Sequence, residues 1–285
     1  MAVGRTVLVA GVLILLFIPY LLWGTGLATA RSQDRLGASL AARSPSVPPH
    51  GPLRPGLAPP TPAPPSASPA VGDPVGRLVI PAIGLSMVVV EGTGTDQLRE
   101  GPGHYPATPL PGQAGNAAIA GHRTTYLHPF SDLDRLVPGD RITVATPQGL
   151  FLYSVTRSEV VDPSDVAVVG PTPTPTLTLT TCNPKYSARQ RLVVKAALVP
   201  TESGPVRTPA PAISTAPTNL DGPHGSPDTT GAIVWGVATL AVGLAWWAAF
   251  RRRRHWTTWV IGFLPFAAVC FVWFGHLDRA LPGNF

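Results

Sequence analysis

The chain has 285 residues, of which 35 are proline and 29 are glycine, so a considerable part of it resists regular secondary structure. Hydrophobic residues make up 45% and charged residues only 13%, which excludes a fully disordered chain and argues against an ordinary cytosolic enzyme. The net charge of +6 would suit nucleic-acid binding, but basic and acidic residues nearly balance between Arg77 and Val199. The excess lies beside apolar segments and therefore indicates membrane topology.

The first apolar segment runs from Val7 to Leu27 and carries no charged residue. A helix needs about 20 apolar residues to cross a bilayer, so we expect residues 1-30 to form an N-terminal membrane anchor. The sequence Ala28-Thr29-Ala30 resembles the cleavage site of a secretory signal. A removed signal peptide is therefore the alternative interpretation.

Two segments have the composition of linkers. From Pro45 to Pro74 proline alternates with alanine, serine and glycine, and no aromatic residue is present to form a core. Such a chain favours extended polyproline II geometry. We therefore expect proline-rich linkers over residues 31-76 and, from a similar composition, over residues 200-230.

The segment between the linkers, residues 77-199, has a usual size for one domain. Its signals are mainly those of short strands bounded by Gly, Pro, Asn and Asp. Strands are expected at Leu78 to Ile80, Met87 to Glu91, Ala117 to Ala120, Ile142 to Thr146, Leu150 to Val161, Leu177 to Thr181 and Leu192 to Leu198. Short helical pieces fit around Asp96 to Arg99 and Ser131 to Leu136, and Pro106 to Gly115 is expected to be an irregular loop. This spacing of strands predicts a mainly β domain, a closed or nearly closed β-barrel with short helices.

The last segment, residues 231-274, contains two further apolar stretches, Gly231 to Phe250 and Thr257 to Phe274. Between them lies the arginine run Arg251 to Arg254. The positive-inside rule keeps such a turn in the cytoplasm, so we expect a transmembrane hairpin, with transmembrane helices at both ends of the chain and the middle outside the cell. A buried helical hairpin of a soluble protein is the alternative.

The two cysteines fall in different parts of this arrangement. Cys270 lies in the last apolar stretch and Cys182 in the β domain, so the two are not expected to pair. An unpaired thiol on the oxidising side of a membrane is a candidate nucleophile. The alternative role for Cys182 is that of a small buried hydrophobic residue.

The neighbours of Cys182 favour the catalytic role. Cys182 ends an alternating run, Leu177 to Thr181, and Asn183-Pro184 must terminate that strand. A returning strand from Leu192 would place Arg191 opposite Cys182 across a hairpin. A guanidinium at that position can favour the thiolate and bind an oxyanion.

A cysteine nucleophile also needs a proton donor and acceptor. The β domain offers three histidines: His104, His122 and His128. His104 and His128 lie in segments rich in Pro and Gly, whereas His122 follows an apolar strand directly. We therefore expect His122 to be the partner of Cys182.

These residues resemble the signature of the sortases, the cell-wall transpeptidases of Gram-positive bacteria. The resemblance rests on Thr178-Leu179-Thr180-Thr181-Cys182, on Arg191 and on Ala120-Gly121-His122-Arg123. The segments Gly101-Pro102-Gly103-His104-Tyr105-Pro106 and Cys182 to Arg191 look most like the class E branch of actinobacteria. The common class E form has His where this chain has Asn183.

The resemblance implies an eight-stranded sortase barrel with His122, Cys182 and Arg191 meeting at one end. It implies an enzyme that cleaves a sorting signal, LPXTG-like and of the Leu-Ala-x-Thr-Gly kind, between Thr and Gly. With the apolar segments described above, we expect this enzyme to be membrane-anchored and multi-pass, with an extracytoplasmic catalytic domain. Its implied partners are sorting-signal-bearing surface proteins and a peptidoglycan precursor amine. No cofactor or metal is expected.

Two alternatives remain beside this interpretation. One is a sortase-like binding or scaffold module whose three site residues no longer work. The other is an L,D-transpeptidase, a cell-wall enzyme that also uses cysteine and histidine, although the Ser-His-Gly-Cys cluster of those enzymes is missing from this sequence.

Overall fold

The computed structural model describes residues 2–43, 68–209, 219–220, 227–250 and 256–280. The chain divides into two compact units, one within Ala28–Pro223 and the other made of Met1–Leu27 with His224–Asn284. All of the strands belong to the first unit.

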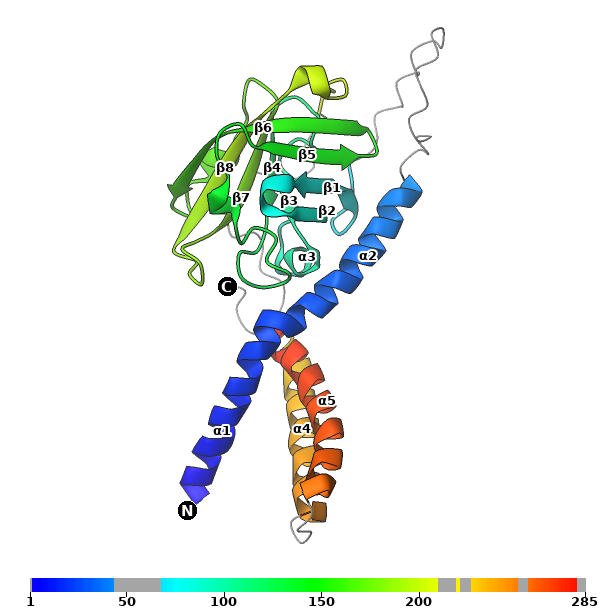
Figure 1. Ribbon diagram of the computed structural model, residues 1–285, viewed down its shortest axis with the longest axis vertical. Coiled ribbons are helices and arrows are strands. Elements are labelled where there is room, and N and C mark those ends of the chain that lie inside the picture. The colour runs from blue at the N-terminus through cyan, green and yellow to red at the C-terminus, as the bar shows by residue number, and fades with distance from the viewer. Residues whose placement is uncertain (1, 44–67, 210–218, 221–226, 251–255, 281–285) are drawn as a thin grey trace. The chain divides into compact units, whose positions relative to one another are not determined.

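Eight strands close into one barrel (Figure 1), in the order β1-β2-β3-β4-β7-β8-β6-β5. Their bounds are β1 Pro74–Ile80, β2 Leu85–Glu91, β3 Gly103–His104, β4 Asn116–Ala120, β5 Arg141–Thr146, β6 Gly149–Val161, β7 Thr176–Asn183 and β8 Gln190–Leu198. The predicted eight-stranded barrel is confirmed, and seven of its strands overlap the seven runs expected from the sequence.

The eighth strand, β3, was expected to be part of a loop. It has two residues, Gly103 and His104, so it is too short to show alternation in the sequence. It pairs in parallel with β2 and antiparallel with β4, and so bridges the two. The approach to β2 is close, because a Cβ on Gly103 would lie 2.2 Å from the carbonyl oxygen of Gly92. Glycine is therefore required at this position.

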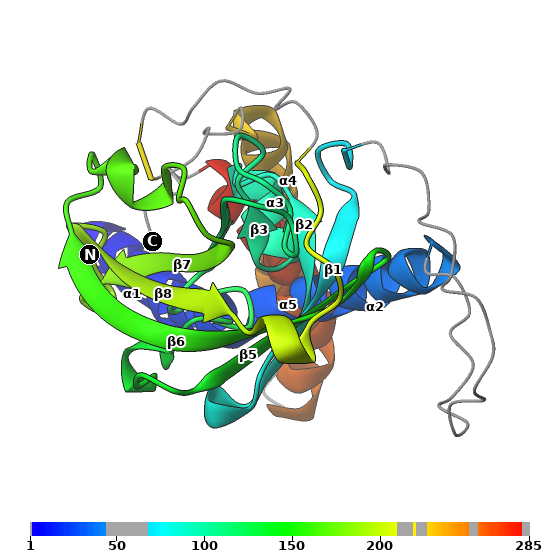
Figure 2. The same ribbon diagram turned by 90° about the horizontal axis from the view of Figure 1, so that it is seen from above.

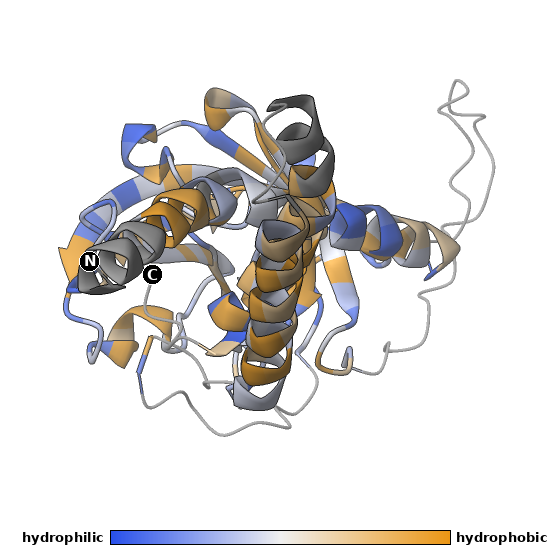
Figure 3. Ribbon diagram, turned by 90° about the horizontal axis from the view of Figure 1, so that it is seen from below, coloured by the Kyte–Doolittle hydropathy of each residue, from blue (hydrophilic) through white to orange (hydrophobic). Residues whose placement is uncertain are grey.

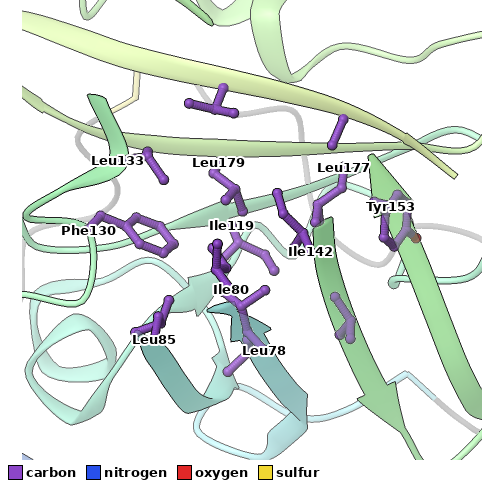
Figure 4. Close-up of a cluster of buried hydrophobic side chains, with 14 of the residues drawn as sticks. Leu78, Ile80, Leu85, Ile119, Phe130, Leu133, Ile142, Tyr153, Leu177 and Leu179 are labelled. Atoms are coloured by element: carbon purple, nitrogen blue, oxygen red, sulfur yellow. The ribbon is translucent and has the colours of Figure 1, made fainter. Parts of the chain in front are cut away.

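The barrel interior is filled by alternate side chains of the strands, which point toward one another in Figure 4. The leucines of β7, Leu177 and Leu179, are fully buried there, as the alternation of that strand predicted. The same core contains Leu78, Ile80, Ile119, Phe130, Leu133, Ile142 and Tyr153. Thr178 and Thr180 lie on the opposite, outer face of β7 and are nonetheless buried. Other parts of the chain therefore pack against the outer face of β7.

The residues that cover this face form a second apolar cluster on the outer side of β4, β7 and β8. Val193 of β8 and Ala118 of β4 pack there with Tyr105 and with the short helix η4 (Val166–Val169). Strand β4 runs parallel to β7, β7 runs antiparallel to β8, and the long strand β6 lies beside β8 (Figure 2). The second apolar cluster thus covers the outer face of these strands.

The remaining short helices lie at the connections between strands. The helix expected at Asp96 to Arg99 is α3, Thr95–Glu100, and the one expected at Ser131 to Leu136 is the 3-10 turn η3, Leu133–Arg135. Two further 3-10 turns are η2, Pro81–Ile83, and η5, Pro200–Glu202.

The N-terminal linker differs from the expectation of residues 31-76. Helix α2 covers Thr25–Arg43, and its Leu36 and Leu40 are buried against Val88 and Val90 of β2. Gln33 donates from Nε2 to the Val88 oxygen at 2.9 Å and accepts the Val88 amide at 2.7 Å. The first part of the expected linker is therefore a helix that completes the β2 side of the barrel, while residues 44–67 lie outside the described residues.

The second expected linker, residues 200-230, also begins with ordered contacts to the barrel. The amide of Ala114 donates to the Arg207 oxygen at 2.9 Å, and the amide of Arg207 donates to the Gly112 oxygen at 3.2 Å. Further along, Leu220 is buried against the second apolar cluster. Residues 210–218 and 221–226 lie outside the described residues.

The other unit is helical. It contains α1 (Ala2–Pro19), the π-helical turn η1 (Tyr20–Gly24), α4 (Thr229–Phe250) and α5 (Trp256–Ala280). The ring of Tyr20 lies edge-on to Phe271, with centroids 5.1 Å apart, and the indole of Trp273 donates to the Ala232 oxygen at 3.0 Å.

Apolar residues dominate α4 and α5 (Figure 3). Among the residues searched, one helix, Thr229–Ala249, is long and apolar enough to cross a membrane. The other two spans expected from the sequence, Val7 to Leu27 and Thr257 to Phe274, coincide with helices but are not confirmed as membrane segments. Of the run Arg251 to Arg254 that was expected to face the cytoplasm, nothing is described.

Candidate active site

The structure pairs Cys182 with Arg191 across the β7–β8 hairpin, as the sequence predicted. The Cys182 thiol is in no disulfide and is partly exposed. Arg191 is 5% exposed, and its Nη1 donates to the backbone oxygens of Ala188 and Gln190, each at 2.9 Å. The hairpin itself therefore holds the guanidinium in place on the outer side of β8.

His122 continues the parallel register of β4 with β7, in which Ala120 pairs with Thr180. The residues on either side of His122 are hydrogen-bonded to β7, Gly121 through its backbone and Arg123 through its side chain. The amide of Gly121 donates to the Thr180 oxygen at 3.1 Å, and Nη1 of Arg123 donates to the Cys182 oxygen at 3.1 Å. His122 lies two residues beyond Ala120, whose β7 partner Thr180 lies two residues before Cys182.

Arg123 ties the histidine segment to the end of β7. It is 5% exposed, and besides the Cys182 oxygen its Nη1 binds Oδ1 of Asn183 at 2.8 Å. Its Nη2 lies 3.1 Å from Oδ2 of Asp134. The sequence motif contained Arg123, but its spacing gave no sign of this role, because the contacts join segments far apart in the chain.

The loop after His122 folds back beneath it. The Phe130 amide donates to the His122 oxygen at 3.0 Å, and the His122 and Tyr126 rings lie 4.9 Å apart. Tyr126, Leu127 and His128 have positive φ, an unusual run for residues other than glycine. Gly121 is required for this arrangement, since a Cβ there would lie 2.6 Å from the Phe130 ring.

Tyr105 forms the wall of the site next to β7. Its hydroxyl lies 3.1 Å from Oγ1 of Thr180, and it is 1% exposed. Burial raises the pKa of Tyr105 to about 12, against smaller opposing effects of the Thr180 hydrogen bond and the Arg191 charge. Tyr105 is therefore a neutral hydrogen-bond donor at any physiological pH.

The second apolar cluster is held over β4 by a buried amide. Asn116 donates from Nδ2 to the oxygens of Val168, at 3.3 Å, and Gly170, at 3.0 Å. Its Oδ1 accepts the Thr178 hydroxyl at 2.7 Å. The segment that carries η4 is thereby fixed over the outer face of β4 and β7.

The two other histidines lie in different surroundings. His104 is 1% exposed and lies between Oε2 of Glu91, 2.9 Å from Nδ1, and the Pro109 oxygen, 3.0 Å from Nε2. A carbonyl oxygen can only accept, so Nε2 carries a proton and this histidine braces the loop 105–115. His128 is exposed. Of the three histidines, His122 is the one whose neighbours Gly121 and Arg123 are hydrogen-bonded to β7.

Within the described part of the chain, no three His, Cys, Asp or Glu side chains gather into a group that could hold a metal ion. The candidate site residues Cys182, His122 and Arg191 carry a thiol, an imidazole and a guanidinium. A nucleophile, a proton carrier and a fixed cation are the groups that acyl transfer requires.

Comparison with known proteins gives a match of residues 78–199 to the family model of the sortase domain. Sortase SrtE1 of Streptomyces coelicolor is 32% identical over 209 residues, which are 68% of this chain and 55% of the relative. The putative sortase YwpE of Bacillus subtilis is 33% identical over 86 residues, which are 30% of this chain and 84% of that protein. The crystallised sortase E of Streptomyces avermitilis is 38% identical, with 48% of this chain and 93% of that chain covered and a TM-score of 0.43.

The coverage differs between relatives. The chain spans 55% of the length of SrtE1 and 58% of the length of sortase D from Bacillus subtilis. The match to the sortase domain model ends at residue 199, so the described helices α4 and α5 lie beyond it.

Proposed function

Because the chain belongs to the sortase family, in its class E-like branch, we propose that it is a membrane-anchored cysteine transpeptidase that cleaves a C-terminal sorting signal. The signal is of the Leu-Ala-x-Thr-Gly kind and is cut between threonine and glycine. The observation that carries this proposal is the pairing of Cys182 with Arg191 across the β7–β8 hairpin, with support from the hydrogen bond between the Gly121 amide and the Thr180 oxygen, which joins the segment before His122 to β7.

In the first half-reaction the Cys182 sulfur attacks the threonine carbonyl carbon. The developing oxyanion is stabilised by the guanidinium of Arg191, which the hairpin holds in place without reorganisation. The carbon–nitrogen bond then breaks, and the glycine amine leaves with a proton from His122. A thioester between Cys182 and the threonine carbonyl remains.

In the second half-reaction an amine attacks the thioester carbonyl. His122 takes the proton from the amine, a new amide bond forms, and the Cys182 thiolate leaves. We propose that the amine belongs to a peptidoglycan precursor, so that the net result is attachment of a surface protein to the cell wall.

We further propose that three helical segments anchor this enzyme, with the barrel outside the cell. The described helix Thr229–Ala249 supports one span by length and composition. The uncharged stretches Val7 to Leu27 and Thr257 to Phe274, with the arginine run between the last two, support the other two. Residues 77-199 would be the catalytic domain of this arrangement.

The test is a peptide assay with the full-length chain. Fluorogenic peptides carrying Leu-Ala-x-Thr-Gly, Leu-Pro-x-Thr-Gly or the same residues in scrambled order are incubated with and without an amine acceptor. We expect cleavage of the first two after threonine, an acyl adduct on Cys182 by mass spectrometry, and an amide product with the acceptor. Binding of the peptides without any adduct or cleavage would instead establish the inactive binding module.

A further inference from the structure

The outer face beside the candidate site is occupied by a piece of the chain itself. Leu220, which the sequence places in the second proline-rich linker, is 4% exposed. It packs in the second apolar cluster with residues of β4, β8 and the η4 turn. We call Asn219 and Leu220 the Leu220 segment.

Two backbone hydrogen bonds hold this segment in place. The Leu220 amide donates to the Pro163 oxygen at 2.9 Å, in the connection from β6 to β7. The Leu220 oxygen accepts the Tyr105 hydroxyl at 3.2 Å, the same hydroxyl that lies 3.1 Å from Oγ1 of Thr180. Both peptide groups of Leu220 are therefore used, as they would be for an extended peptide bound in a groove.

The position of the segment relates directly to the site. Val193, which shares its cluster, lies two residues from Arg191 and on the same side of β8. Thr180, which the Tyr105 hydroxyl contacts, lies two residues from Cys182 and on the same side of β7. Two residues of an extended strand span about 7 Å, so the residues that Leu220 contacts lie within about two residue positions of the Cys182–Arg191 pair.

An extended substrate whose scissile carbonyl reaches Cys182 would need this same position for one of its own residues. Leu220 fills that space, and the Pro163 oxygen and the Tyr105 hydroxyl beside it are already hydrogen-bonded to Leu220. Two peptides cannot occupy one close-packed site together.

From these contacts we infer that the Leu220 segment is an internal ligand of the substrate groove, and that a sorting peptide must displace it before acylation. This inference rests on the proposed function. The consequence is a substrate affinity lowered by the fraction of molecules in which the groove is open.

The first experiment measures whether the groove is occupied, independently of catalysis. The full-length Leu220→Cys variant is made in a Cys182→Ala, Cys270→Ala background, and the introduced thiol is labelled with a maleimide. Val206→Cys in the same background is the matched control, since Val206 follows the barrel on the same segment and is 44% exposed. We expect labelling at position 220 to be slower by about tenfold or more, because the buried thiol reacts only after local opening. Equal rates would overturn the inference.

The second part of the experiment adds the sorting peptide that the wild type cleaves. Displacement of the Leu220 segment should accelerate labelling at position 220 in proportion to peptide occupancy and leave the Val206→Cys control unchanged. Slow labelling that the peptide does not accelerate would refute the competition. If the wild type cleaves no peptide at all, the proposed function fails instead, and the labelling rate without peptide still reports on the segment.

A kinetic comparison completes the test. Leu220→Ala should lower KM for the peptide by about two- to tenfold at unchanged kcat, because it weakens the internal ligand and touches no reacting group. Val206→Ala should match the wild type in both constants. A higher KM in Leu220→Ala would show that Leu220 supports substrate binding, and would contradict the inference.

Discussion

At the scale of single residues, the two thiols of the chain have unequal surroundings. Cys182 ends β7, is partly exposed and faces Arg191, whereas Cys270 is buried within helix α5. A thiolate is the reactive form, and it is disfavoured in apolar surroundings without a cationic neighbour. The two cysteines are therefore not interchangeable as nucleophiles.

We predict that Cys182→Ala abolishes peptide cleavage and that Cys270→Ala leaves it within a factor of about two, since Cys270 lacks the features that activate a thiol. The measurement is turnover of a fluorogenic sorting peptide by each purified full-length variant, together with mass spectrometry of the acyl adduct. Comparable loss in both variants, or an adduct on Cys270, would overturn the assignment.

Two arginines of the β7–β8 hairpin carry the same charge in different positions. Arg191 is buried, lies opposite Cys182 and is fixed by two backbone oxygens, whereas Arg189 is exposed in the turn. A planar guanidinium can hold a substrate carbonyl and an oxyanion together, and lysine keeps the charge but loses that fork of donors.

We predict that Arg191→Lys reduces turnover by about 100- to 1,000-fold, the usual effect of removing one oxyanion donor. Arg189→Lys should remain close to the wild type, and circular dichroism should show both variants folded. A folded Arg191→Lys variant that keeps most of the rate would mean that the electrophilic group is elsewhere.

Arg123 illustrates a residue that acts through others. It connects the segment of His122 to the Cys182 oxygen, to Asn183 and to Asp134. We assign it no role as a reacting group. Its fixed, divergent donors hold two loops at one spacing, which a lysine ammonium cannot do with the same geometry.

We predict that Arg123→Lys lowers kcat by about tenfold with KM little changed, because small misplacements of catalytic groups have large effects on the rate. Arg135→Lys is the matched control, since the Arg135 side chain is 73% exposed and pairs with Asp132. Rates are normalised to the active fraction by titrating Cys182. If Arg123 were important for folding alone, the normalised kcat of Arg123→Lys would equal that of the control.

At the scale of elements, helix α2 provides hydrogen bonds to β2 at the position that the short strand β3 does not reach. Strand β3 pairs with Val90 and Glu91 only, so the outward amide and carbonyl of Val88 find no strand partner there. The side chain of Gln33 binds both groups, and it also donates to the Glu100 oxygen at 2.9 Å. A single amide side chain thus replaces a missing pair of ladder hydrogen bonds.

We predict that Gln33→Leu destabilises this edge by about 1–3 kcal/mol, the penalty for leaving buried backbone groups without partners. Hydrogen exchange of the Val88 amide should then accelerate by about five- to hundredfold. Asp34→Ala, a change of an exposed neighbour on the same helix, should leave the exchange rate unchanged. Unchanged exchange in Gln33→Leu would show that α2 does not protect β2 in solution.

Some of the strands and helices could be predicted from the sequence and others could not. Seven strands were predictable because alternating residues mark a half-buried strand directly. Helix α2 was not recognised, although Thr29, Gln33, Leu36 and Leu40 recur at helical spacing, because only two of them are apolar and the segment leads into a proline-rich stretch. The short strand β3 carries no periodic signal at all.

Of the contacts at the candidate site, some could likewise be predicted from the sequence and others could not. The pairing of Cys182 with Arg191 was predictable because a hairpin joins neighbours in sequence. The contacts of Arg123, Tyr105 and Leu220 join segments that are distant along the chain. No local pattern encodes such contacts, so they required the folded structure.

At the scale of the whole molecule, the membrane topology determines on which side of the membrane the barrel lies, and therefore whether it can bind a surface protein. The described helix Thr229–Ala249 has the length and composition of one span, and the stretch Thr257 to Phe274 is nearly as apolar but not established as a span. If both cross the membrane, Arg254 and Phe285 lie on opposite sides. If only the first crosses, the two positions lie on the same side.

We predict opposite sides, with Arg251 to Arg254 in the cytoplasm, because four arginines in a short connection resist translocation. A green fluorescent reporter, which is active only in the cytoplasm, should be bright when fused after Arg254 of a truncated chain and dark when fused after Phe285. An alkaline phosphatase reporter, which is active only outside, should give the reverse pattern and serves as the control for expression. Two bright fluorescent fusions would show that α5 does not span, and two dark ones would place the arginine run outside. Either result would remove the hairpin from the proposed topology, while peptide cleavage by the same chains would show independently whether the barrel is a working sortase.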